Sequence, residues 1–164
     1  PGVDMSTGSL GQGFAVADGM ALANRLNGNS HRVYCLIGDG ESQEGEIWET
    51  AMSAAHYKND HLCAIIDVNG LQIDGRTSDV MNPNPLDEKF KAFGWHVIDV
   101  DGHDFKQLRA AFKEASETKG QPTAIIAKTI KGKGVSFMED QAGWHGKAPN
   151  LEQYEQAIQE LEAQ

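Results

Sequence analysis

Short apolar runs and longer amphipathic stretches alternate along most of the chain. Four apolar runs have the length of buried strands, at residues 33–37, 62–68, 95–100 and 123–128. Five stretches show helical periodicity, at residues 10–26, 44–57, 87–93, 105–119 and 151–161. Strands that alternate with helices in this way predict an α/β fold, in which a doubly wound, mainly parallel sheet carries helices on both faces.

Capping residues mark several of the predicted helix ends. Gly28 is placed to stop the first helix, and Asp104 is placed to cap the helix that begins at residue 105. Asn150 and Gln153 have the spacing of a capping box before the last helix. That helix carries an apolar stripe, which we expect to pack onto the body of the domain, at Leu151, Tyr154, Ile158 and Leu161.

Composition narrows the class of protein. The 164 residues, 40% of them apolar, suffice for a core, so residues 1–164 are predicted to form a single domain. A formal net charge of −10 argues against a general nucleic-acid or anionic-membrane surface. No apolar run has the length of a membrane span and no leader is recognised, so a cytoplasmic protein is predicted. Cys35 and Cys63 lie in apolar runs and are predicted to be free thiols of the core.

Polar residues follow the first two apolar runs. Asp39 lies between Gly38 and Gly40 after the first run, and Asn69 follows the second. Because a helix separates these runs, a right-handed parallel crossover would bring both tips to one sheet edge, where ligands bind. Their oxygens and the Leu71 carbonyl suit Mg²⁺, or Ca²⁺, and the glycines let main-chain N–H groups approach an anion. We therefore predict a metal-bound diphosphate, although aspartate between glycines is also common turn chemistry.

The segment from Gly38 to Gly75 resembles the thiamine-diphosphate motif of transketolases, which opens with GDG and closes near an Asn. The resemblance extends upstream through residues 1–4 and 6–13 and downstream through residues 128–134 and 144–147. It implies that Asp39, Asn69 and the Leu71 carbonyl are the Mg²⁺ ligands. It also implies that Gly40 and Asn69 contact the diphosphate.

The same resemblance implies contacts with the rest of the cofactor. Gly8, Ser9 and Leu10 match the loop that meets the cofactor's rings, and Ile73 matches an apolar residue near the thiazolium. His145 matches the family histidine that reaches the diphosphate and substrate oxygens, where an imidazole could also shuttle protons.

Other titratable residues carry weaker signals. Glu44 either faces a partner domain, as the matching transketolase glutamate does, or stabilises the start of a helix. The remaining histidines are predicted to be surface or packing residues, at His31, His56, His61, His96 and His103.

The resemblance implies an enzyme that transfers a two-carbon ketol unit between sugar phosphates, with thiamine diphosphate and Mg²⁺ as cofactors. In transketolases a second domain holds the aminopyrimidine ring and supplies an activating glutamate. We recognise neither that domain nor the portion before the first motif, so we expect a fragment that lacks its natural N-terminal part and is inactive alone. The expected partner is a C-terminal transketolase subunit or domain with the pyrimidine-binding site, in a dimer of composite units.

Several alternatives share part of this pattern. Deoxyxylulose-phosphate synthases, dihydroxyacetone synthase and the decarboxylating component of pyruvate dehydrogenase are other thiamine enzymes, and the segments 6–13 and 144–146 favour transketolase over the first and third. A non-catalytic cofactor-binding subunit would keep the same fold. A doubly wound domain for another phosphate ligand is weakened because the chain has neither a GxGxxG turn nor a P-loop lysine motif.

Overall fold

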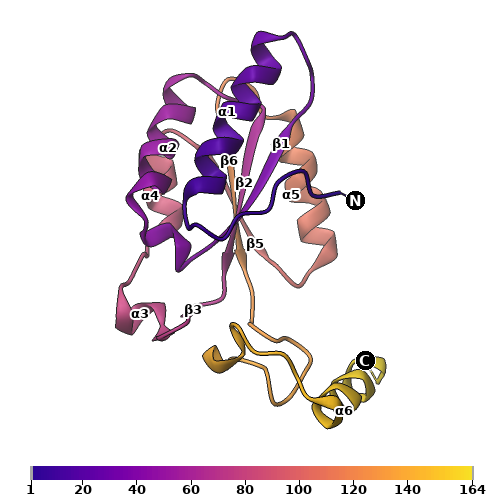
Figure 1. Cartoon of the computed structure of the whole chain (residues 1–164). Coiled ribbons are helices and arrows are strands. Elements are labelled where there is room, and N and C mark those ends of the chain that lie inside the picture. The colour runs from indigo at the N-terminus through magenta and orange to yellow at the C-terminus, as the bar shows by residue number, and fades with distance from the viewer. Residues whose placement is uncertain (1, 164) are drawn as a thin grey trace.

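Four parallel strands form the central sheet of the computed structural model, which describes residues 2–163 (Figure 1). Their order is β1-β2-β6-β5, with strands at β1 Val33–Gly38, β2 Leu62–Val68, β5 His96–Asp101 and β6 Thr123–Lys128. The main helices are α1 Gln12–Leu26, α2 Gly45–His56, α4 Leu86–Ala92, α5 Phe105–Glu117 and α6 Leu151–Glu162. The predicted parallel sheet is confirmed, and Pro1 of the first motif lies outside the described residues.

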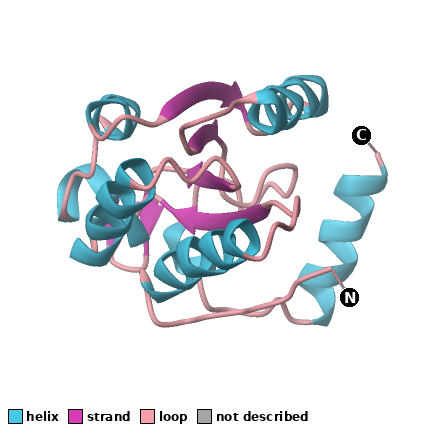
Figure 2. Cartoon of the chain, turned by 90° about the horizontal axis from the view of Figure 1, so that it is seen from above, coloured by secondary structure: helices cyan, strands magenta, loops and turns pink. Residues whose placement is uncertain are grey.

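The sheet separates two hydrophobic cores. Successive residues of a strand point to opposite faces, so Leu62 belongs to the core under α1, α2 and α4, while Cys63 belongs to the core under α5. Phe90 lies in the first core between Trp48 and Trp95, with ring centroids 5.4 and 5.2 Å away. Helices on both faces are therefore confirmed, and Figure 2 shows them on either side of the strands.

The predicted helix ends are formed by the expected residues. Gly28 has a φ of 71° and donates its N–H to Arg25, so the first helix stops there. The Asp104 side chain accepts hydrogen bonds from the N–H groups of two residues in the first turn of α5. Asn150 and Gln153 form both hydrogen bonds of the capping box at α6.

Short elements fill the segments that the sequence predicted to be turns. They are the strands β3 Leu71–Gln72 and β4 Gly75–Arg76, the helix α3 Thr77–Val80, and the 3₁₀ helices η1 Glu41–Gln43 and η2 Ala142–Trp144. β3 and β4 pair as a small antiparallel hairpin at the carboxyl end of β2. The hairpin places Ile73 at its tip.

The apolar stripe of α6 does not pack onto the body, so that prediction is wrong. Leu151 is 72% exposed and Tyr154 is 54% exposed, and α6 stands apart from the sheet in both views (Figures 1 and 2). The helix is fastened at the Glu160 carboxylate, which accepts hydrogen bonds from the Ser136 N–H and hydroxyl at 2.6 and 2.7 Å. No helix among residues 2–163 is long and apolar enough to cross a membrane.

Both cysteines are free, as predicted. Cys63 is fully buried, and burial raises the pKa of its thiol to about 12. Cys35 is only half-buried because β1 is an edge strand, and burial together with the negative charge of Glu41 raises its pKa to about 11.

Candidate functional site

The Asp39 carboxylate lies directly after β1 and is almost fully buried. Its Oδ1 accepts a hydrogen bond from the Gly40 N–H at 2.9 Å, and its Oδ2 accepts one from the Gly70 N–H at 2.7 Å. The Asp39 N–H in turn donates to the backbone oxygen of Asp67 at 3.1 Å. The structure thus brings the tips of β1 and β2 together at one sheet edge, as the crossover predicted.

Burial dominates the electrostatics of this acid. It raises the pKa of Asp39, hydrogen bonds from Gly70 and Gly40 act in the opposite direction, and the negative charge of Asp67 raises it further. An ionised Asp39 is therefore costly in the protein alone. A bound cation would relieve that cost.

Asn69 and Leu71 supply further oxygen atoms beside Asp39. The Leu71 N–H donates to the Asn69 Oδ1 at 2.9 Å, which closes a tight turn. Gly40 packs against this turn so closely that a Cβ atom there would lie 3.1 Å from the Cβ of Gln72. Within residues 2–163 no three His, Cys, Asp or Glu side chains gather to hold a metal, so the candidate metal centre has a single carboxylate among its oxygens.

Glu41 connects two of the predicted cofactor segments, a role that the sequence did not reveal. Its carboxylate accepts hydrogen bonds from the Gly11 N–H at 3.0 Å and from the Gly38 N–H at 3.2 Å. The loop of residues 8–10 is therefore held beside the turn that carries Asp39. Gly8, Ser9 and Leu10 are themselves exposed.

Ile73 and Glu44 both face solvent. Ile73 is 70% exposed at the tip of the hairpin. Glu44 lies one residue before α2, makes no capping hydrogen bond, and precedes the first turn, whose acidic residue is Glu46. Stabilisation of the helix start by a Glu44 capping hydrogen bond is therefore excluded.

His145 follows η2 and is exposed. Its neighbour Trp144 donates its indole N–H to the Phe137 oxygen at 2.9 Å, and the Lys147 ammonium lies 4.8 Å from the Trp144 ring centroid. Among residues 2–163 no hydrogen bond joins His145 to Asp39 or to the turn at residues 69–71, so the structure does not bring these predicted groups into direct contact.

The segment after β6 is tied to the same sheet edge. The Thr129 hydroxyl donates to the Asp67 carboxylate, and the Ile130 N–H donates to the His103 Nε2 at 2.8 Å. Arg76 and Asp140 form an ion pair at 2.7 Å farther along. His103 is thus a connecting residue as well as a surface one. The sequence signal for these contacts was the position of each polar group just beyond a strand.

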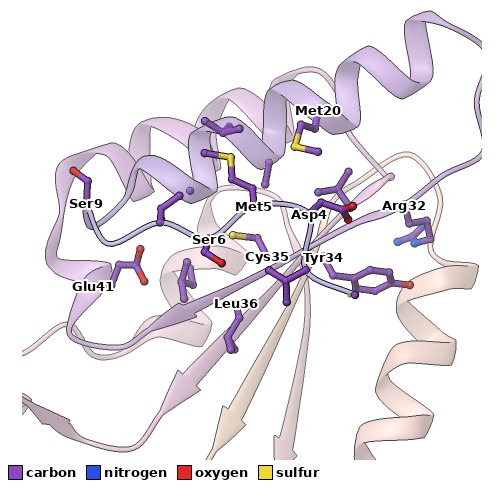
Figure 3. Close-up of a pocket in the computed structure, with 18 of the residues that line it drawn as sticks. Asp4, Met5, Ser6, Ser9, Met20, Arg32, Tyr34, Cys35, Leu36 and Glu41 are labelled. Atoms are coloured by element: carbon purple, nitrogen blue, oxygen red, sulfur yellow. The ribbon is translucent and has the colours of Figure 1, made fainter. Parts of the chain in front are cut away.

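A groove of about 770 Å³ lies between residues 2–10, α1 and β1 rather than over Asp39. Ser9 and Glu41 lie at one end of it, and Arg32 and Tyr34 lie at the other (Figure 3). The groove follows the free edge of β1, where Leu36 is 71% exposed. The largest cavity therefore adjoins the candidate metal centre at one end without containing it.

Residues 1–162 match the family described as transketolase, thiamine diphosphate binding domain. The chain belongs to the transketolase family. Its resemblance to the thiamine-diphosphate motif is confirmed, and the domain is the thiamine-diphosphate-binding domain of this family.

Relatives agree with the transketolase assignment. The chain is 47% identical over 161 residues to 6-deoxy-6-sulfo-D-fructose transketolase subunit SqwG of Clostridium sp. (strain MSTE9), covering 98% of this chain and 58% of the relative. It is 47% identical to human transketolase, covering 98% of this chain and 26% of the relative. The transketolase structure from Campylobacter jejuni superposes with a TM-score of 0.88 at 34% identity, covering 96% of this chain and 26% of the other. The chain thus spans only part of the length of the transketolases it matches.

Proposed function

We propose that this chain anchors thiamine diphosphate through Mg²⁺ in a transketolase that moves a two-carbon ketol unit between sugar phosphates. The hydrogen bond of 2.7 Å from the Gly70 N–H to Asp39 carries this proposal, because it holds a buried acid beside the turn at residues 69–71. Asp39, the Asn69 amide oxygen and the Leu71 carbonyl would hold the metal. Gly40 and Asn69 would contact the diphosphate.

The donor set fits a hard divalent cation. A carboxylate, an amide oxygen and a carbonyl are all oxygen ligands of the kind that Mg²⁺ and Ca²⁺ take, and Mg²⁺ commonly adds phosphate oxygens and water. The raised pKa of Asp39, which burial causes, shows that its charge lacks compensation in the protein alone. The small side of Gly40 leaves main-chain N–H groups accessible near η1.

The remaining residues would position the reactants. When bound, thiamine diphosphate supplies the chemistry of carbon–carbon bond cleavage and formation. The loop of Gly8, Ser9 and Leu10 would meet its rings, and Ile73 would pack near the thiazolium. His145 would donate a hydrogen bond to the diphosphate or to substrate oxygens and move protons there, and Glu44 would face the partner domain.

A second polypeptide would complete the site. Two relatives are named as transketolase subunits: the sulfofructose one from Clostridium, and one for apulose-4-phosphate from Phocaeicola vulgatus, which is 43% identical over 161 residues. By analogy, a C-terminal subunit or domain would hold the pyrimidine ring of the cofactor, in a dimer of composite units. The exposure of Glu44, Ile73 and residues 8–10 supports such a partner surface.

Calorimetric titration tests the proposal. Thiamine diphosphate with Mg²⁺ is titrated into the chain, alone and mixed with a transketolase pyrimidine-binding subunit, with and without chelator. We expect metal-dependent binding in at least one of these samples, its loss in Asp39→Asn, and its retention in Asp99→Asn, which removes an exposed acid from β5. Equal metal-dependent affinity for wild type and Asp39→Asn would refute the ligand assignment, provided that circular dichroism shows both chains folded.

A further inference from the structure

Asp67, near the end of β2, is not among the residues assigned to the metal or the cofactor. Both oxygens of its carboxylate are nevertheless engaged by side chains of the candidate site. The Asn69 Nδ2 donates to its Oδ2 at 3.2 Å, and the Thr129 hydroxyl donates to its Oδ1. One acid therefore joins a predicted metal ligand to the segment that follows β6.

The contact with Asn69 determines which end of that amide faces where. Only the amide oxygen can bind a metal, since the NH₂ group is a donor. Because the Nδ2 is held by Asp67, the Oδ1 is turned toward the Leu71 N–H, from which it accepts at 2.9 Å. An amide oxygen has two lone pairs, so one remains available for a cation.

The backbone of Asp67 adds to this arrangement. Its oxygen accepts the Asp39 N–H at 3.1 Å, so the residue contacts both side chains that are proposed to bind the metal. The next carbonyl, that of Val68, accepts the Thr129 N–H at 3.1 Å. The negative charge of Asp67 also favours a cation close by, although its two oxygens are already used.

We propose that Asp67 is a positioning residue that fixes the Asn69 amide with its oxygen, rather than its nitrogen, toward the metal. This inference rests on the proposed function. An asparagine at position 67 would preserve the shape but offer a single acceptor oxygen, for which Asn69 and Thr129 would compete. The Asn69 amide would then be free to turn over.

The first test compares two metals. Thiamine diphosphate is titrated in the presence of Mg²⁺ or Ca²⁺ into wild type, Asp67→Asn and the control Asp99→Asn, in whichever sample binds cofactor. Loss of an outer partner of a metal ligand weakens metal affinity by about 10–100-fold. We expect that loss for Mg²⁺ in Asp67→Asn and a smaller one for Ca²⁺, because Mg²⁺ demands near-ideal octahedral geometry and Ca²⁺ tolerates distortion. Equal losses for both metals, or none, would overturn the proposal.

A second variant separates the two partners of Asp67. Thr129→Val removes the hydroxyl donor but leaves the contact between Asp67 and Asn69 intact. We expect Thr129→Val to keep the wild-type ratio of Mg²⁺ to Ca²⁺ affinity. If it changes that ratio as strongly as Asp67→Asn does, the effect acts through the segment after β6, and the assignment to the Asn69 amide is wrong.

A measurement without metal or cofactor keeps this inference distinct from the proposed function. The side-chain amide of Asn69 can be followed by ¹⁵N nuclear magnetic resonance in the ligand-free chain. We expect its protons to exchange slowly with solvent in wild type and Asp99→Asn, and faster in Asp67→Asn. If wild type binds no cofactor, the proposed function fails, but unprotected Asn69 protons in wild type are what would overturn the role of Asp67.

Discussion

Replacing Gly132 by alanine should disrupt the loop that leads from β6 toward His145. Gly132 has a φ of 70°, and an added Cβ atom would lie 2.7 Å from the carbonyl carbon, the oxygen and the Cβ of Met138. Two of these three atoms are backbone and cannot rotate away. The loop is closed around this contact by the Asp140 N–H, which donates to the Lys131 oxygen at 2.9 Å.

Gly120→Ala is the matched control, because Gly120 has a similar φ of 74° and its Cβ would meet nothing within 4 Å. Both variants adopt a left-handed conformation that costs an L-residue about 1–2 kcal/mol. Gly132→Ala adds overpacking, worth about 1–3 kcal/mol. For a chain of this length each kcal/mol lowers the Tm by about 2–4 °C, so Gly132→Ala should melt about 2–12 °C below Gly120→Ala if the loop unfolds with the domain.

Thermal melts and amide hydrogen exchange together decide the outcome. If the loop opens locally instead, the two melting temperatures will agree, but the Asp140 amide will lose protection in Gly132→Ala and keep it in Gly120→Ala. Equal melting temperatures combined with equal Asp140 protection would refute the close packing of Gly132 against Met138.

Three further predictions concern a cap, the thiols and pH. Asn150→Ala should cost about 0.5–2 kcal/mol, because it removes the acceptor of the α6 capping box, and hydrogen exchange should show earlier opening of α6. At about pH 8 a thiol reagent should modify Cys35 before Cys63 and both slowly until the chain unfolds, since burial raises both pKa values. Burial also raises the pKa of Asp39 above 3.8, so its stabilising contribution is present below its unfolded pKa and is lost as the pH rises through its folded pKa. Asp39→Asn should therefore gain in urea-unfolding free energy relative to wild type, without metal, between about pH 3 and about pH 7; an opposite trend would contradict this assignment.

The sheet could be predicted because its signal is local. Buried parallel strands appear as continuous apolar runs, and β2 and β6 were predicted at the residues where they occur. The hairpin of β3 and β4 was missed because two-residue strands are too short to show a period. The position of α6 was mistaken for another reason: an apolar stripe shows that a helix has an apolar face, but it does not indicate which surface covers that face.

The site was predictable where a polar residue directly follows a strand. Asp39 and Asn69 could be identified from the sequence because parallel topology alone brings the carboxyl ends of their strands together. Glu41 and Thr129 were missed because their partners, Gly11 and Asp67, are 30 and 62 residues away in the chain. Such contacts depend on how whole segments pack, which no local pattern records.

Charge gives the metal a further task at this edge of the sheet. Asp39, Glu41 and Asp67 lie within one network of hydrogen bonds around the turns at residues 38–41 and 67–71, in a chain of net charge −10. A diphosphate is itself an anion, so this group of acids repels it unless a cation lies between them. Main-chain N–H groups offset the repulsion only in part, because those of Gly38, Gly40 and Gly70 already donate to the carboxylates. The arrangement therefore requires metal for any measurable affinity for the diphosphate, and cofactor binding that survives a chelator would place the diphosphate elsewhere on the molecule.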